Sequence, residues 1–325
     1  MKNKIAFSTG SLLNPKQLLN FSSNVDANEK VHSIWTPESW GKEAFSILGS
    51  ISQVTERIKI GTSIINIYTR TPATIGMGAI TLDLLSNQRV IIGLGTSTPA
   101  LIENLHGIKF KNPLLRMKEY IESIKLLLKK GKTTYDGRII KIVNFELLDH
   151  SREDIPIFMA AVNSKMLNLS KEIADGFILY LKPKDQIKSI ITQTLENKPD
   201  RPFTKAAVII TSVSNREPTK AVKRAARTLV FYISVGKIYY NYLLKTRHVD
   251  VVRKIYFDYH KLGIEEALKN VSSEILDDFV IAGSVNECIN QIKAFRKTGI
   301  DLPILQVNPT LDLNGSLSYK DFFDL

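Results

Sequence analysis

The chain has 325 residues, of which 44% are hydrophobic and 23% charged, so it can bury a full core as two ordinary domains or as one large α/β barrel. Its single cysteine, Cys288, excludes an internal disulfide, and the sequence has no clustered cysteines and histidines for a metal site, which favours a reducing cytoplasm. The net charge of +12 is compatible with a small anionic partner. The cations are spread over many segments without a nucleic-acid-binding motif, and no segment has the apolar length of a membrane span, so we expect neither nucleic acid nor membrane as a partner.

Short apolar runs rich in β-branched residues recur along the chain and predict strands. The first run, residues 4–9, is followed by Gly10 and is too short for a signal peptide, so we interpret it as a strand. Further strands are expected at residues 33–37, 58–65, 89–95, 156–162, 176–181, 205–213 and 302–307. Most of these runs are apolar nearly throughout, as is typical of parallel strands covered on both faces.

Helical patterns lie between the strands and begin at recognisable signals. Asn14-Pro15, Thr71-Pro72 and Pro113 each precede a helical segment, and Ser284 with Glu287 three positions later has the spacing of a capping box. Eight β/α units in this length predict an α/β fold, a (β/α)₈ TIM barrel forming a single domain over residues 1–325. An open doubly wound sheet is the alternative.

Two segments interrupt this alternation. Residues 133–147 alternate in polarity and contain Asp136-Gly137, which predicts a β-hairpin inserted before the fifth strand, over about residues 133–149. From residue 220 to about residue 283 the sequence is helical, long and aromatic, which predicts a helical insertion late in the barrel. We expect its tyrosines and phenylalanines to form core or a subunit interface, with a ligand wall as the less favoured alternative.

The turn Gly93-Leu94-Gly95-Thr96-Ser97-Thr98 joins a predicted strand to a predicted helix. A dinucleotide-binding turn would follow the first strand, carry a third glycine and be followed by an acidic residue at the end of the next strand. Here the turn follows the fourth strand, Thr98 occupies the third glycine position, and the next strand ends without an acid. A nicotinamide site is therefore disfavoured, whereas free N–H groups with the hydroxyls of Thr96 and Ser97 suit a phosphate.

Residues 34–110 resemble the luciferase-like superfamily, specifically its branch that uses the deazaflavin coenzyme F420. The most specific elements are GTSIINIYTRTP, after the third predicted strand, and GLGTSTPALIENLHG, after the fourth. Residues 155–179 and 279–307 resemble further segments of the family, so the resemblance covers most of the chain. The family fold is a barrel with insertions, in agreement with the fold predicted from the pattern.

The resemblance also implies positions for ligands. Family members have a non-prolyl cis peptide in a bulge that ends the third strand, beneath the central ring of the deazaflavin, and Ser63-Ile64 occupies that place here. The other implied cofactor-binding residues are Asn66, Thr96, Ser97, Ala160, Ala161, Val162 and Asn163. Ser39, Trp40 and Tyr68 are implied for the substrate pocket.

The chemistry implied is hydride transfer, in which the protein orients coenzyme and substrate and handles a proton. Candidate proton handlers are Glu38, at the end of the second strand, and Glu103 and His106, after the fourth. Their structural alternatives are a salt bridge for Glu38, a helix-surface carboxylate for Glu103 and a loop-capping group for His106. Ser39 stands where the sugar-phosphate dehydrogenases of this branch have a histidine, and GTSIINIYTRTP is more similar to the methylene-tetrahydromethanopterin reductases.

Three functions are left open. The first is an F420-dependent oxidoreductase that acts on a CH–NH or CH–OH group of a small substrate, such as a pterin. The second is an FMN-dependent, luciferase-like monooxygenase, because flavin mononucleotide is also anionic, and the third is a non-enzymatic barrel that binds a partner. We also expect a homodimer, because family barrels commonly pair through helices after the early strands and Asp83 is the only charged residue among residues 73–85.

Overall fold

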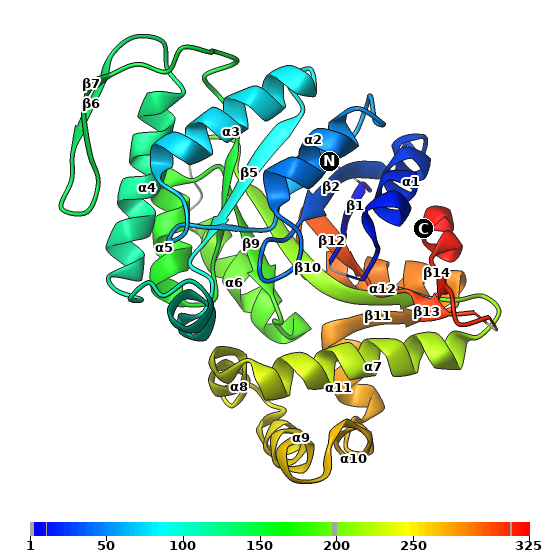
Figure 1. Ribbon diagram of the computed structural model, residues 1–325. Coiled ribbons are helices and arrows are strands. Elements are labelled where there is room, and N and C mark those ends of the chain that lie inside the picture. Colours follow the sequence, from blue (N-terminus) through cyan, green and yellow to red (C-terminus); the bar gives the residue numbers. More distant parts are fainter. Residues whose placement is uncertain (1–2, 11, 197–199, 313) are drawn as a thin grey trace. The chain divides into compact units, whose positions relative to one another are not determined.

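The computed structural model describes residues 3–10, 12–196, 200–312 and 314–325, and the chain forms two compact units (Figure 1). Unit 1 comprises Met1–Tyr180 and Asn197–Ala206, and unit 2 comprises Leu181–Glu196 and Ala207–Leu325. Every residue that the sequence analysis assigns to the cofactor, the substrate or the proton lies in unit 1.

Unit 1 is built on a parallel sheet. Its strands pair side by side in the order β1 (Ile5–Ser8), β2 (Val31–Thr36), β3 (Lys59–Thr62), β5 (Val90–Gly95), β8 (Ile157–Ala160) and β9 (Gly176–Tyr180), and the short β4 (Ile65–Asn66) adds to β5. All residues of β1 and β5 are buried, as expected for parallel strands covered on both faces. The strand expected at residues 58–65 is divided into β3 and β4, because Ser63 and Ile64 leave the ladder between them.

The helices of unit 1 alternate with these strands, which confirms the α/β class. They are α1 (Pro15–Asp26), α2 (Ala44–Ser52), α3 (Pro72–Leu85), α4 (Pro113–Leu127) and α5 (Ser164–Ile173), with a short π-helical turn, η1 (Leu101–Leu105), after β5. The predicted start signals act locally: the Asn14 side chain accepts from the Gln17 N–H in a capping box, and the Thr71 hydroxyl accepts from the Thr74 N–H.

The predicted hairpin consists of β6 (Thr133–Asp136) and β7 (Lys141–Phe145), which pair antiparallel. Its turn is attached to α4 through Glu119, whose carboxylate accepts the N–H groups of Arg138, Ile139 and Ile140 at 2.9, 2.8 and 2.9 Å. Burial raises the pKa of Glu119, but these donors outweigh it and lower the pKa below its usual value. Gly137 is required here, because a Cβ atom would lie 2.4 Å from Glu119 Oε2.

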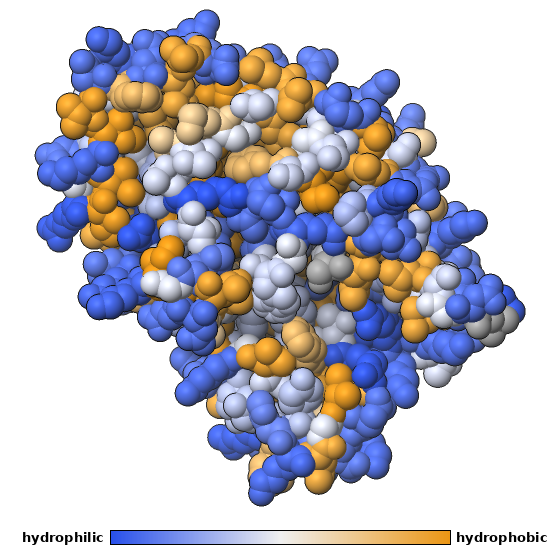
Figure 2. All heavy atoms as spheres, in the orientation of Figure 1, coloured by the Kyte–Doolittle hydropathy of each residue, from blue (hydrophilic) through white to orange (hydrophobic). Residues whose placement is uncertain are grey.

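Helix α3 leaves part of an apolar face uncovered. Met77, Leu84 and Leu85 are 50%, 52% and 53% exposed. In Figure 2 hydrophobic residues gather over this part of unit 1. A groove of about 400 Å³ lies between α2 and α3, lined by residues that include Phe45, Met77 and Leu85.

Unit 2 contains the last strands of the sheet. Strand β10 (Thr204–Val213), which begins in unit 1, pairs with β11 (Val280–Gly283) and with β12 (Leu302–Val307). The helices α6 (Lys184–Glu196) and α12 (Val285–Arg296) precede β10 and β12, and the predicted capping box of Ser284 and Glu287 begins α12. The chain ends with β13 (Thr310–Leu311), β14 (Leu317–Ser318) and a 3₁₀ turn, η2 (Lys320–Asp324).

The helical insertion comprises α7 (Pro218–Val235), α8 (Lys237–Leu243), α9 (Val249–Leu262), α10 (Ile264–Leu268) and α11 (Ser273–Phe279). The prediction that it stays helical to about residue 283 is wrong, because Val280–Gly283 is the buried strand β11, paired with residues 210–213. An apolar run of this length has no periodicity that separates a strand from the end of a helix. Within the insertion the aromatic side chains stack on one another, with the rings of Tyr240 and Tyr256 4.0 Å apart.

The single cysteine of the chain lies in unit 2. Cys288, on α12, is fully buried, and burial raises the pKa of its thiol to about 12, with a smaller contribution from Glu287. In the part of the chain that the structure describes, no helix has the length and apolarity needed to cross a membrane.

Candidate functional site

Ser63 and Ile64 lie at the carboxyl end of β3, and the peptide bond between them is cis, as the resemblance implies. The Glu38 N–H donates to the Ile64 carbonyl at 3.3 Å, and Ser63 Oγ lies 3.3 Å from Ser8 Oγ. These contacts connect the end of β3 to the ends of β1 and β2. The carboxyl ends of parallel strands are where α/β proteins bind their ligands.

Close packing brings together two of the predicted cofactor residues. A Cβ atom on Gly95 would lie 2.6 Å from Ile64 Cγ1 and 3.3 Å from Ala160 Cβ. Ile64, Gly95 and Ala160 therefore form a strip of small and apolar groups across the ends of β3, β5 and β8, which we call the apolar strip. A larger residue at position 95 would displace its neighbours.

The Glu38 carboxylate already has partners on both oxygens. Oε1 pairs with Arg70, which also pairs with Glu43, and Oε2 accepts the Ala44 N–H at 2.9 Å. The Glu38 side chain is 13% exposed. The salt-bridge alternative is therefore present in the structure, and it ties the β2–α2 loop to the start of α3.

Asn66 and Tyr68 form the next part of the rim. Asn66 is buried, and its Oδ1 accepts the N–H groups of Tyr68 and Thr69 at 3.1 and 3.0 Å. The Tyr68 hydroxyl donates to the Lys111 carbonyl at 2.9 Å, and its ring stacks on Phe110 at 4.9 Å. Asn66 thus acts on the local backbone, and Tyr68 is a buried side chain that joins two loops.

The turn after β5 is half-buried and rich in hydroxyl groups. Ser97 has a left-handed backbone with φ of 57°, and its hydroxyl has no partner among the described residues. The Thr96 hydroxyl donates to the Ser97 carbonyl at 3.3 Å. Glu103 and His106 are exposed beyond this turn, and Glu103 accepts the Phe110 N–H at 3.1 Å.

The segment after β8 and the β2–α2 loop complete the predicted set. Ala161 is buried, Val162 is half-buried, and the exposed Asn163 caps α5 by accepting the Met166 N–H at 3.0 Å. Ser39 and Trp40 are both exposed, Trp40 at 58%. The structure therefore brings Glu38, Ile64 and Ala160 to neighbouring strand ends, whereas Glu103 and His106 lie on an exposed turn.

Two arginines of unit 1 lie beside these residues and could not be assigned to the site from the sequence. Arg70 pairs with Glu38 and Glu43, and Arg116 lies with its guanidinium carbon 4.8 Å from the ring centre of Tyr68. No carboxylate lies within ion-pair distance of Arg116 among the described residues, and its Nε is buried without an acceptor. The cluster Lys109, Lys111, Arg116 and Lys118, uninterrupted by any acid, is the sequence signal that indicates this positive region.

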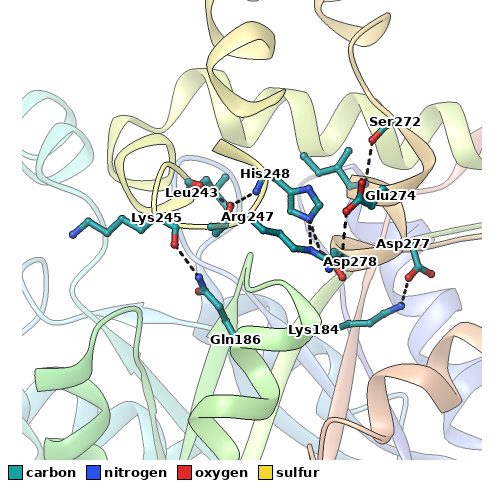
Figure 3. A network of polar contacts seen from close by, with 12 residues as sticks. Lys184, Gln186, Leu243, Lys245, Arg247, His248, Ser272, Glu274, Asp277 and Asp278 are labelled. Atoms are coloured by element: carbon teal, nitrogen blue, oxygen red, sulfur yellow. Dashed lines mark hydrogen bonds and ion pairs between the residues drawn. The ribbon is translucent and has the colours of Figure 1, made fainter. Parts of the chain in front are cut away.

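Unit 2 contains a second polar network, which connects α11 to the α8–α9 segment and to α6. Figure 3 shows Arg247 and His248 directed at Asp278, whose Oδ2 lies 2.8 Å from Arg247 Nη2 and 2.6 Å from His248 Nε2. Lys184 pairs with Asp277 at 2.9 Å. Asp278 and His248 are 3% and 5% exposed, so buried polar contacts join α11 to the segment between α8 and α9.

Lys182 is a further residue whose environment could not be predicted from the sequence. It follows β9, is 7% exposed, and its Nζ lies 3.5 Å from the ring centre of Tyr242. Burial lowers the pKa of Lys182 to about 7. Among the described residues, no group of three or more His, Cys, Asp or Glu side chains is arranged to hold a metal.

The fold of this chain is similar to that of proteins with solved structures. The chain is similar to the structure of the coenzyme F420 dependent tetrahydromethanopterin reductase from Methanopyrus kandleri, with a TM-score of 0.80, 21% identity, and coverage of 93% of this chain and 92% of that chain. This likeness shows the fold, and the predicted (β/α)₈ barrel with inserted segments is confirmed.

Two curated relatives match over most of their length. The 5,10-methylenetetrahydromethanopterin reductase of Archaeoglobus fulgidus is 28% identical over 266 residues, which are 80% of this chain and 80% of the relative. The F420-dependent glucose-6-phosphate dehydrogenase of Amycolatopsis mediterranei is 22% identical over 306 residues, 88% of this chain and 87% of the relative.

The family model described as luciferase-like monooxygenase matches residues 28–302, which include the apolar strip, the turn at Thr96 and Ser97, and the helical insertion. The chain therefore belongs to the luciferase-like monooxygenase family.

Proposed function

We propose that this protein is an oxidoreductase that transfers a hydride between coenzyme F420 and a small organic substrate. The observation that carries the proposal is the apolar strip of Ile64, Gly95 and Ala160 beside the hydroxyl groups of the β5 turn. The dehydrogenase of Amycolatopsis mediterranei and the reductase of Methanopyrus kandleri are both named as F420-dependent, which supports this coenzyme.

The residues at the strand ends fit the chemistry of this coenzyme, which has a flat ring, a phosphodiester and an acidic tail. The apolar strip has no bulky polar side chain, so a flat ring can lie against it. The Ser97 hydroxyl and the N–H groups of the turn can donate to a phosphate. Arg116, which no described carboxylate neutralises, adds positive potential beside Tyr68.

Each residue of the site then has a defined task. When bound, F420 supplies the carbon that accepts or gives the hydride. The apolar strip orients the ring, and Thr96 and Ser97 bind the anionic part, with the backbone of residues 160–163 beside them. Tyr68, Ser39 and Trp40 contact the substrate, and Asn66 shapes the rim.

For proton transfer we consider the three candidates Glu38, Glu103 and His106. Glu38 has partners on both carboxylate oxygens, so its proposed task is to position the β2–α2 loop. Glu103 and His106 are exposed to solvent and stay the candidates for exchanging a proton with the substrate.

For the substrate we propose a methylenetetrahydromethanopterin-like pterin, which places the reaction at a carbon–nitrogen bond. The names of the Archaeoglobus fulgidus and Methanopyrus kandleri reductases support this choice. The name of the Amycolatopsis mediterranei enzyme specifies glucose 6-phosphate, so that substrate is the comparison in the test.

The coenzyme is tested by titrating the protein with F420 and, separately, with FMN while following their fluorescence. Saturable binding of F420, with FMN weaker by about tenfold or more, supports the proposal. Tighter binding of FMN would support the monooxygenase instead, and binding of neither would contradict both enzymes. The substrate is tested by following the absorbance of F420 with a methylene pterin and with glucose 6-phosphate; turnover of the sugar phosphate alone would contradict the pterin.

A further inference from the structure

Helix α7 carries several cations, of which all but one have an acidic partner. Lys223 and Arg227 both pair with Glu265, and Lys220 pairs with an acid in the preceding turn. The guanidinium of Arg224 has neither an ion-pair partner nor a hydrogen-bond acceptor among the residues that the structure describes. The acidic residues around α7 thus pair with Lys220, Lys223 and Arg227, and among the described residues none pairs with Arg224.

Arg224 is also partly buried. Its Nε atom is enclosed without an acceptor, while the residue as a whole is partly exposed to solvent. Burial, and then the nearby charge of Arg227, lower the pKa of Arg224. Buried donors in folded proteins nearly always have acceptors, and this holds most strongly for charged groups. Because Arg224 is partly exposed and no described acid pairs with it, its guanidinium is available to an oxyanion that arrives from solvent.

The position of Arg224 is set by the face of α7 on which it lies. Arg224, Thr228 and Tyr232 are four residues apart and share one helix face. Thr228 Oγ1 donates to Asn308 Oδ1 at 3.0 Å, and Gln306 Nε2 donates to the Tyr232 hydroxyl at 3.4 Å. These partners lie at the carboxyl end of β12 or directly after it.

The same placement is visible in the packing of unit 2. Helix α7 packs against β11 and reaches β13, and Figure 1 shows it running alongside these strands. The helix face that bears Arg224 is therefore directed at the carboxyl ends of strands, which is where barrel proteins bind ligands.

We propose that Arg224 is the centre of an anion site in unit 2, at the carboxyl end of β12, that takes the carboxylate or phosphate group of a small molecule. A guanidinium presents parallel N–H donors in a planar fork, which matches either oxyanion. Thr228 and Asn308 bond to each other and fix the wall of the site beside it. The site lies within unit 2 and does not depend on the coenzyme proposed for unit 1.

The site is tested on the full-length protein without added coenzyme. Inorganic phosphate and malonate are titrated by calorimetry against sodium chloride at matched ionic strength, so that the two arms separate phosphate from carboxylate. The parent protein is expected to bind at least one of these anions saturably. We expect Arg224→Gln to weaken this binding by about tenfold or more, and Arg224→Lys, which keeps the charge but loses the fork, to fall between the two.

The matched control is Lys220→Gln, which removes a cation of the same helix that is paired with Glu217, and the affinity of this variant should stay within about twofold of the parent. Absence of saturable binding by the parent, or equal affinity in Arg224→Gln, overturns the proposal. Labelling of the parent protein with phenylglyoxal supplies a measurement that needs no variant. Phosphate should slow the labelling of Arg224 by about fivefold or more and leave that of Arg227 unchanged. An unchanged rate at Arg224 would overturn the proposal as well.

Discussion

Arg70 and Glu38 form an ion pair whose side chains are 16% and 13% exposed, and the pair joins the start of α3 to the end of β2. Through its backbone N–H, Glu38 also bonds the Ile64 carbonyl at the end of β3. One acidic residue thus connects the β2–α2 loop, α3 and the apolar strip. Its effect on ligand binding is expected to come through this connection.

Replacing Glu38 with glutamine should destabilise unit 1. The change leaves the largely buried Arg70 with one carboxylate, so we expect the free energy of unfolding to fall by about 1–3 kcal/mol. Urea unfolding measures this loss, and Glu56→Gln, at an exposed position, should change it by less than about 0.5 kcal/mol. Unchanged stability combined with loss of one limb of the pH–rate profile would identify Glu38 as a proton handler instead.

A methyl group at position 95 should disturb the apolar strip. In Gly95→Ala the added Cβ lies 2.6 Å from Ile64 Cγ1, and such overpacking costs about 1–3 kcal/mol. We expect lower stability together with F420 binding weakened by about tenfold. Gly49→Ala is the control, because a Cβ there meets nothing within 4 Å and alanine in a helix adds about 0.5–1 kcal/mol. Parent-like F420 affinity in Gly95→Ala would remove the strip from the coenzyme site.

A negative charge at position 97 should oppose the anionic part of the coenzyme. At an effective dielectric constant near 20, the repulsion at contact is on the order of several kcal/mol, so F420 affinity in Ser97→Asp should fall by about a hundredfold or more. Ser97→Ala should cost about 1 kcal/mol, because backbone donors are kept. Fluorescence titration of the three proteins at two salt concentrations measures both effects, and parent affinity should fall as salt rises. An Asp variant that binds like the parent would place the coenzyme elsewhere.

Lys182 should make unfolding depend on pH above neutrality. Burial lowers the pKa of Lys182 from 10.5 to about 7, so between these values the unfolded chain binds more protons than the folded chain. The free energy of unfolding therefore rises with pH across this window, by up to about 1.4 kcal/mol per unit. Lys182→Met removes this slope, so its stabilising effect in urea should be largest at neutral pH and decline toward the alkaline limit. A constant difference between the two proteins would contradict the shift.

The exposed face of α3 is the proposed contact of a homodimer. Met77, Leu84 and Leu85 are each at least 50% exposed there, and a charge in such a face opposes association. We expect Leu84→Lys to shift the parent from dimer to monomer in light scattering at micromolar concentration. Leu262→Lys, at an exposed apolar position of α9, should leave the dimer intact. A monomeric parent would contradict the proposal.

Those parts of the fold that depend on local chemistry could be predicted from the sequence. The caps at Asn14, Thr71 and Ser284 each satisfy N–H groups within one helical turn. Asp136-Gly137 marks the hairpin turn by its two residues alone, although the contact of that turn with Glu119 on α4 is not visible in the sequence. Strand β11 could not be separated from the preceding helix, because its identity depends on pairing with β10, a segment about 70 residues earlier.

The candidate site also contains residues that the sequence can predict and residues that it cannot. Ile64 and Ala160 could be named from the family motifs, which keep the order of the strand ends. Arg116 and Arg224, which have no acidic partner among the described residues, could not be named in this way. The lack of a partner depends on which groups the surrounding acids bind. Glu119 lies one turn from Arg116 on α4, yet its carboxylate binds the hairpin backbone; similarly, Glu265 pairs with Arg227 and not with Arg224. No local sequence pattern reveals which partner Glu119 or Glu265 binds.

The buried position of Cys288 has a practical consequence for following motion in this protein. The chain has one thiol, it is enclosed in unit 2, and burial keeps it protonated at neutral pH. A cysteine introduced at an exposed position, such as Val143 on the hairpin, would react with a maleimide dye or spin label while the native thiol stays silent. Single-site labels can therefore report how each unit responds to ligands without first replacing any native residue.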